Sequence, residues 1–251
     1  MIKIIKVSLF AGFILLEACS SIGTSKEEGS LRKAANFNIQ LGAGYLSQNK
    51  LSLAKKKLTK ALEQDPDNAL AHSTMALLLE KVGEAEEAEK YYEEAISLAP
   101  GNSEINNNFG TFLCNQGRFD EAQELFKKAI DDAYYKTPFV ALINAGKCAM
   151  NNSKFELAES YLRKALRIEP KSASALYLMA VLGNKTNRYL MTRAYIQRYH
   201  DIVSPSAQSL WVQIQAEQAL GDKVFMSELI KIINKKFPDS DEAGMSMRLM
   251  R

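Results

Sequence analysis

Cysteine and histidine carry the most reactive side chains of this 251-residue chain, and both are rare in it. A thiol can be acylated, oxidised to a disulfide or bound to a metal, and an imidazole can act as a base or a metal ligand. The cysteines are Cys19, Cys114 and Cys148, the histidines are His72 and His200, and none of them stands at a metal-ligand spacing. No glycine-rich phosphate loop or nucleophile motif is present. The sequence therefore predicts no metal site, no cofactor, no small-molecule substrate and no enzyme.

Cys19 follows a stretch with the composition of a secretion leader. Residues 1–6 carry two lysines, and residues 7–16 are an apolar run much shorter than the roughly 20 residues that a membrane-spanning helix needs. Residues 16–19, Leu-Glu-Ala-Cys, resemble the lipobox of bacterial lipoproteins, with Glu17 where a small residue is usual. The alternative is an ordinary leader that happens to contain a cysteine.

The lipobox resemblance implies a lipid-anchored protein. Residues 1–18 are then a signal peptide, and Cys19 carries acyl chains such as palmitate after cleavage. Ser20, in place of the aspartate that is common in lipoproteins of the inner membrane, implies the periplasmic face of the outer membrane. Residues 19–31 are short and polar and contain two glycines, which predicts a flexible tether.

A pattern of small, bulky and small residues closed by proline returns along the rest of the chain. Pro66 and Pro100 are 34 residues apart. Pro100 and Pro170 are 70 apart, two periods plus two residues, and Pro170 and Pro238 are 68 apart. Within each copy the small residues are spaced to lie on one helical face, where a neighbouring helix can approach closely.

This period predicts six repeats, each of two antiparallel helices. With the proline at position 32, the repeats begin at Ala35, Ala69, Ser103, Phe139, Ala173 and Ala207. The pattern resembles the tetratricopeptide repeat, which implies an all-α solenoid with a right-handed superhelix and a concave groove lined by the first helices. Repeats are expected over residues 32–240, followed by a cap or tail at 241–251.

Turn residues mark the ends of helices in the repeats. Gly83 and Gly117 fall at position 15, where a left-handed residue is expected to end the first helix, and Asn152 lies in the corresponding loop of the fourth repeat. Two extra residues fall within 131–138, as either a tolerated insertion or a binding feature. Larger residues replace alanines in the last two repeats, which is typical of end repeats.

Asparagines recur on the first helices of repeats three and four. Asn107 and Asn108 take positions 5 and 6, Asn144 takes position 6, and Lys147 takes position 9, with Thr111 on the same predicted surface. In the tetratricopeptide family these positions face or border the groove. Asparagine is a poor helix former, but its amide both donates to and accepts from a peptide backbone. We therefore expect a groove that binds an extended segment of a partner. The alternative is that the asparagines of repeat three only cap and start a helix.

The two remaining cysteines form an even pair in an oxidising compartment. Cys114 and Cys148 take positions 12 and 10 of the first helices of adjacent repeats, which lie side by side. Such positions can bring two Cα atoms within the ~4.4–6.8 Å that a disulfide requires. The alternative is two independent small core residues.

Net charge excludes one class of partner. The formal charge is +3, too weak for a nucleic-acid-binding protein. Acidic and basic residues alternate along the helices, which indicates an ordinary solvated surface.

Together, the lipobox, the short tether, the six repeats and the runs 107–122 and 144–148 resemble the PilF/PilW lipoproteins, the pilotins of type IV pilus secretins. The resemblance implies an outer-membrane lipoprotein that binds secretin subunits and promotes their localisation and multimerisation, for pilus biogenesis and twitching motility. A general periplasmic adaptor lipoprotein, which recruits cell-wall or outer-membrane assembly enzymes, is the alternative. An enzyme or an enzyme's regulatory module lacks support because no catalytic constellation is present.

Overall fold

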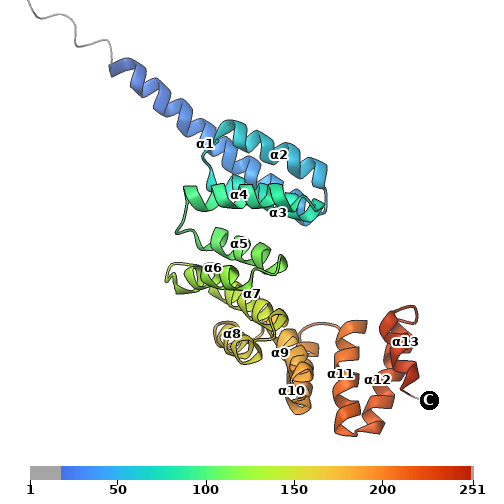
Figure 1. The fold of residues 1–251 in the computed structure, drawn as a ribbon. Coiled ribbons are helices and arrows are strands. Elements are labelled where there is room, and N and C mark those ends of the chain that lie inside the picture. Colours follow the sequence, from blue (N-terminus) through green and yellow to red (C-terminus); the bar gives the residue numbers. More distant parts are fainter. Residues whose placement is uncertain (1–17, 250–251) are drawn as a thin grey trace, which may run out of the picture. The chain divides into compact units, whose positions relative to one another are not determined.

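The computed structural model describes residues 18–249, with side chains from Glu27 to Leu249. Over this range it is all-helical, and the predicted class, an all-α solenoid of tetratricopeptide type, is confirmed (Figure 1). The predicted leader, residues 1–17, lies outside the described residues, as does the side chain of Cys19. The chain divides into two compact units, one up to Ala99 and one from Pro100 onward.

The first unit holds two helix pairs. They are α1 (Ala18–Ser47) with α2 (Leu51–Gln64), and α3 (Ala69–Val82) with α4 (Ala85–Leu98). Ala54, Leu58 and Ala61 of α2 are fully buried against α1. Leu58 lies so close to Gly42 that an added Cβ would come within 2.7 Å of its side chain. The small residue at this position therefore sets how closely the two helices approach.

The second unit holds four helix pairs and a final short helix. They are α5 (Ser103–Asn115) with α6 (Phe119–Asp131), α7 (Pro138–Asn151) with α8 (Phe155–Ile168), α9 (Ala173–Lys185) with α10 (Tyr189–His200), α11 (Ala207–Leu220) with α12 (Lys223–Lys236), and α13 (Asp241–Arg248). Gly110 of α5 packs on α6, where an added Cβ would lie 3.1 Å from Phe126 and 3.2 Å from the carbonyl oxygen of Ala122. The same small-against-large contact thus builds both units.

Helix boundaries follow the repeat register closely. Helices α3, α5, α9 and α11 begin at the predicted residues, and α7 begins at Pro138, one residue early. Position 15 is left-handed in every repeat, at Asn49, Gly83, Gly117, Ser153, Asn187 and Gly221. In the fourth repeat the left-handed residue is Ser153, with φ 56°, while Asn152 has φ −85°. The backbone reversal between the two helices is therefore a property of the position, whichever residue occupies it.

The prediction of a flexible tether over residues 19–31 is wrong. Helix α1 is continuous for 30 residues, and its first half extends past the end of α2 (Figure 1). Residues 27–33 are exposed. The packed part of α1 already supplies the unfavourable nucleation step, so each further residue only has to extend an existing helix. Gly29 costs only about 1 kcal/mol relative to alanine, and the lysine, glutamate, leucine and arginine beside it favour helix.

The C-terminal residues form a capping helix. Ala243 of α13 is fully buried in the cluster that includes Ile230 and Ile233 of α12. Ser240 caps α13 by accepting a hydrogen bond from the Ala243 N–H at 3.1 Å. Gly244 does not break the helix, and a Cβ added there would meet no neighbouring atom.

The two extra residues lie in the loop between α6 and α7. Asp132 accepts hydrogen bonds from the Ser103 hydroxyl and from the Tyr134 N–H, and both lower the pKa of its carboxyl. Tyr134 is 93% exposed. The base of the loop is thus tied to the start of α5, while its aromatic tip is in solvent.

His200 should make folding stability depend on pH. Its Nε2 lies 2.9 Å from the Ser209 Oγ, which links α10 to α11, and burial lowers its pKa below the ordinary 6.5. The unfolded chain then binds a proton at a higher pH than the folded chain does. We therefore expect the free energy of unfolding to fall as the pH drops below about 6.5. Urea denaturation between pH 7.5 and 5 measures this. A His200→Gln variant should lose part of the slope, and an unchanged slope would contradict the assignment.

Candidate functional site

The predicted groove residues lie on α5 and α7, the first helices of repeats three and four, which pack side by side. Asn107 is only 5% exposed, Asn108, Thr111 and Asn144 are half-buried, and Lys147 is exposed. The structure therefore brings all five to one strip of the second unit, at different depths.

The asparagine amides of this strip form a hydrogen-bonded chain. Asn144 Nδ2 donates to Asn107 Oδ1 at 2.9 Å, and Asn107 Nδ2 donates to Asn108 Oδ1 at 3.3 Å. Both ends of the Asn107 amide are thus engaged inside the protein. Asn107 is buried and holds Asn108 and Asn144 in place, and its direct contact with a partner stays a prediction.

The alternative that these asparagines only start a helix is also wrong. Helix α5 begins at Ser103, and Asn102 caps it by accepting two backbone N–H bonds of the first turn at 3.0 and 3.1 Å. Asn107 therefore lies inside the helix. Asn106 has another role, since its amide donates to the carbonyl oxygen of Pro100 at 3.0 Å and fixes the preceding turn.

Asn108, Asn144 and Lys147 keep groups that can bind a partner. No hydrogen bond among the described residues engages Asn144 Oδ1 or Asn108 Nδ2, and no described carboxylate pairs with Lys147. Thr111 differs, because its hydroxyl donates to the Asn107 carbonyl oxygen of its own helix at 2.8 Å. The strip thus offers one amide acceptor, one amide donor and one ammonium group, which suit an extended peptide segment with a carboxylate.

A disulfide between Cys114 and Cys148 forms a second link between α5 and α7. The two Cα atoms are 5.8 Å apart, within the range that the pairing requires. Both residues are buried. The disulfide and the Asn107–Asn144 bond hold the same two helices at different heights, so they fix the spacing of the strip.

Sequence reasoning missed one buried ion pair. Glu217 of α11 has a fully buried side chain, and Arg193 of α10 donates to it with its Nε 3.0 Å from both carboxylate oxygens. Glu217 stands at position 11 of its repeat, which is apolar in the three repeats that begin at Ala69, Ser103 and Phe139. An acidic residue at an apolar position was the available signal.

The described residues form neither a metal-ligand cluster nor a membrane-spanning helix. No three His, Cys, Asp or Glu side chains among them converge as metal ligands would. Among the same residues, no helix has the length and hydrophobicity that crossing a bilayer takes.

Two family descriptions match the sequence. Residues 72–217 match the family of the cilia and flagella-associated protein 70 middle TPR-like domain, and residues 39–103 match the tetratricopeptide repeat.

Two bacterial proteins are similar to this chain over 63% of its length or more. The type IV pilus assembly protein PilF of Pseudomonas aeruginosa is 28% identical over 236 residues, 92% of this chain and 94% of PilF. An uncharacterized protein of Haemophilus influenzae is 33% identical over 159 residues, 63% of this chain and 88% of that protein.

Solved structures give the same result. The crystal structure of PilW, described as a widely conserved type IV pilus biogenesis factor, aligns with a TM-score of 0.81 at 29% identity, covering 85% of this chain and 98% of PilW. The structure of Pseudomonas aeruginosa PilF aligns with a TM-score of 0.77 at 28% identity, covering 88% and 100%.

Proposed function

Because this chain belongs to the tetratricopeptide-repeat family and is homologous to PilF and PilW, we propose that it is an outer-membrane lipoprotein that binds secretin subunits in type IV pilus biogenesis. It promotes the localisation and multimerisation of those subunits, and through them twitching motility. The observation that carries the proposal is the similarity to a pilus assembly protein over 92% of the chain. Tetratricopeptide proteins are scaffolds and adaptors, so binding and not catalysis is the activity expected of this fold.

Membrane attachment in this proposal comes from Cys19. Each buried CH₂ of an acyl chain contributes about 0.8 kcal/mol to membrane affinity, and more than one chain makes the attachment stable. Cys19 lies in the second position of α1, so a rigid helix leads from the lipid to the first repeat. The protein would then stand on the periplasmic face of the outer membrane.

Partner recognition falls to the strip on α5 and α7. Asn144 and Asn108 present free amide groups, and Lys147 presents an unpaired charge among the described residues. Asn107 and the Cys114–Cys148 disulfide keep these groups at a fixed spacing. Preorganisation of this kind lowers the entropy cost of binding.

Replacing Cys19 by alanine should abolish membrane attachment and secretin multimers together. We expect a gene deletion complemented with Cys19→Ala to lack multimers, while wild-type complementation restores them. Membrane fractionation and non-denaturing gels of the secretin measure both. Attachment of the Cys19→Ala protein to the outer membrane without a partner would contradict the anchor. Normal secretin multimers in the deletion strain would contradict the secretin role.

Replacing Asn144 and Lys147 together by alanine should weaken binding of the purified secretin subunit by about tenfold or more, since each lost hydrogen bond is worth about 0.5–1.5 kcal/mol. The melting temperature should fall by a smaller amount than the affinity, because Asn144→Ala also removes the hydrogen bond to the buried Asn107 Oδ1, whereas Lys147 is exposed and its loss should not affect stability. Lys127→Ala on α6 is the matched control, and it should bind normally. An equal loss of stability and of affinity would mean that the strip is structural.

The alternative, a general adaptor for cell-wall or outer-membrane assembly enzymes, predicts a different outcome of crosslinked co-purification. Secretin would then be absent from the recovered partners, and secretin multimers would persist in the deletion strain.

A further inference from the structure

Charge is unevenly distributed in the first unit. Residues 29–62 contain seven Lys and Arg and no Asp or Glu, whereas residues 63–99 contain ten Asp and Glu and two Lys. The expectation that acidic and basic residues alternate along the helices is therefore wrong for this unit. The first repeat, formed by the packed part of α1 and by α2, is basic, and the second repeat is acidic.

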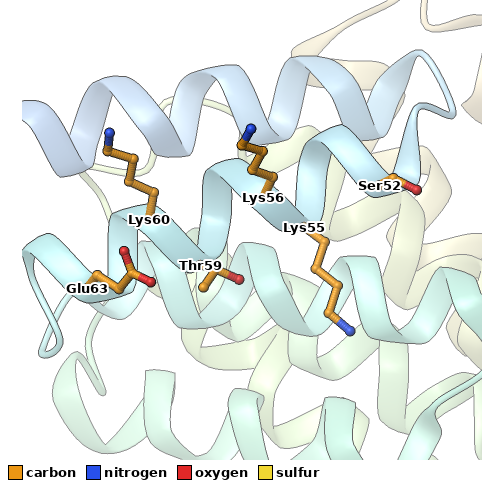
Figure 2. A pocket seen from close by; sticks show the side chains of 6 residues that line it. All are labelled: Ser52, Lys55, Lys56, Thr59, Lys60 and Glu63. Atoms are coloured by element: carbon orange, nitrogen blue, oxygen red, sulfur yellow. The ribbon is translucent and has the colours of Figure 1, made fainter.

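Three of the basic residues share one exposed face of α2. Lys55, Lys56 and Lys60 line a shallow, open hollow of about 460 Å³ together with Ser52, Thr59 and Glu63. Figure 2 shows Lys56 and Lys60 extending to one side of the helix and Lys55 to the other. The three ammonium groups therefore spread over the width of the face instead of converging on one point.

These lysines have no internal partner. No carboxylate of the described side chains lies within 4.0 Å of their ammonium groups, although Glu63 stands at the end of the hollow. Like charges four residues apart on a helix, such as Lys56 and Lys60, repel each other. Lys55 also borders a second hollow, where Glu84, Glu86 and Glu87 of α4 are its acidic neighbours, whereas Lys56 and Lys60 are exposed on the other side of the helix.

We propose that this face of α2, together with Arg32 and Lys33 of α1, binds the anionic phospholipid headgroups of the membrane that holds the protein. This inference rests on the proposed lipid anchor at Cys19. Helix α1 carries both Cys19 and the basic repeat, and about 25 Å of helix separates Cys19 from Ala35. The anchor therefore confines the lysines near one bilayer surface, where anionic lipids attract basic residues.

Exposed apolar residues on the same repeat favour a lipid surface over an acidic protein. Leu31 and Phe37 of α1 are 42% and 62% exposed, and Leu53 of α2 is 46% exposed. Basic residues interleaved with exposed apolar side chains are typical of helices that lie in the headgroup layer. The hydroxyls of Ser52 and Thr59 can also donate hydrogen bonds to phosphate oxygens. The contact requires that α1 lies along the membrane.

The test is vesicle flotation of the acylated protein purified from membranes. One set of vesicles contains phosphatidylcholine alone, and the other contains phosphatidylcholine with phosphatidylglycerol. A lysine near an anionic surface contributes roughly fivefold in affinity, so Lys55→Gln, Lys56→Gln and Lys60→Gln together should lower the preference for phosphatidylglycerol by about 100-fold. Added salt should weaken the wild-type preference in the same direction.

The control is a triple variant with the same change of charge on α12, Lys231→Gln, Lys235→Gln and Lys236→Gln, which are exposed and should not affect partitioning. Because the acyl chains alone hold the protein on either kind of vesicle, the preference is measured with both kinds competing in one mixture, and an absence of any wild-type preference would overturn the lipid face and leave the anchor standing. With each kind of vesicle offered alone, wild-type binding only to phosphatidylglycerol vesicles would support the face and contradict the anchor. A triple α2 variant that floats like wild type but no longer binds the secretin subunit would overturn the lipid face in favour of a protein partner.

Discussion

Replacing Arg193 by methionine should lower the free energy of unfolding by about 3–5 kcal/mol, because the change leaves a buried carboxylate without its cation. The side chain of Glu217 is 0% exposed, and its two oxygens each accept from Arg193 Nε at 3.0 Å. Asp222 stands 3.5 Å from the same guanidinium, so a second negative charge would remain beside the orphaned one. Urea denaturation gives the free energy.

Two further variants keep this prediction testable even if the single variant does not fold. The double variant Arg193→Met with Glu217→Leu should recover most of the loss, because apolar residues of similar size often replace a buried pair without cost. Lys90→Met breaks the exposed pair with Glu87 at 3.1 Å and should cost about 1 kcal/mol or less. A similar small cost for Arg193→Met would mean that water reaches Glu217 in solution.

The Arg193–Glu217 pair also connects two repeats. Arg193 lies on α10 and Glu217 on α11, so the pair joins the fifth repeat to the sixth. Thr192, the neighbour of Arg193, replaces the usual alanine and is accommodated by Gly183, where an added Cβ would lie 2.4 Å from its hydroxyl oxygen. The atypical residues of the last repeats therefore form specific contacts of their own, in place of the small-against-large contacts of the earlier repeats.

The fold was predictable because its determinants are periodic in the sequence. Gly110 and Ala122 mark where α5 and α6 meet, and glycine at position 15 marks the turn between such helices, so local pattern and packing agree. Ser153 shows that residue type alone does not predict the turn, because Ser153 adopts the left-handed backbone conformation and the neighbouring Asn152 does not. Position in the repeat decided the conformation, and residue preference came second.

The sequence predicted where the site residues lie on the helices, but it did not predict which of their side chains are buried. Spacing placed Asn107 and Asn144 on adjacent helices, but which amide is buried depends on how far α5 and α7 approach, and no periodic pattern records that distance. The Arg193–Glu217 pair has the same origin, since its partners are joined only by helix packing. The helical arm of α1 was missed for another reason. Glycines indicate a flexible segment only where no adjacent helix continues into that segment, and here α1 continues into it.

The Cys114–Cys148 disulfide should contribute about 3–4 kcal/mol to stability, because it closes a loop of 34 residues and so restricts the unfolded chain. Wild-type protein denatured in urea with a reductant should be less stable by that amount than oxidised protein. The variant Cys114→Ala with Cys148→Ala should resemble the reduced wild type and should not respond to reductant. Comparing the double variant with reduced wild type separates the effect of losing the crosslink on stability from the effect of changing the two side chains.

Loss of the disulfide should affect partner binding less than it affects stability. The Asn107–Asn144 hydrogen bond still joins α5 to α7 at 2.9 Å, so the reduced protein keeps one of the two links across the strip. Adding Asn107→Ala to the double cysteine variant removes the second link, and we expect affinity for the secretin subunit to fall clearly only then. Thiol alkylation followed by peptide mass measurement, on protein isolated from the periplasm, first determines whether Cys114 and Cys148 are bonded in the cell. Free thiols at both Cys114 and Cys148 would show that the hydrogen bond alone sets the spacing of these helices in the cell.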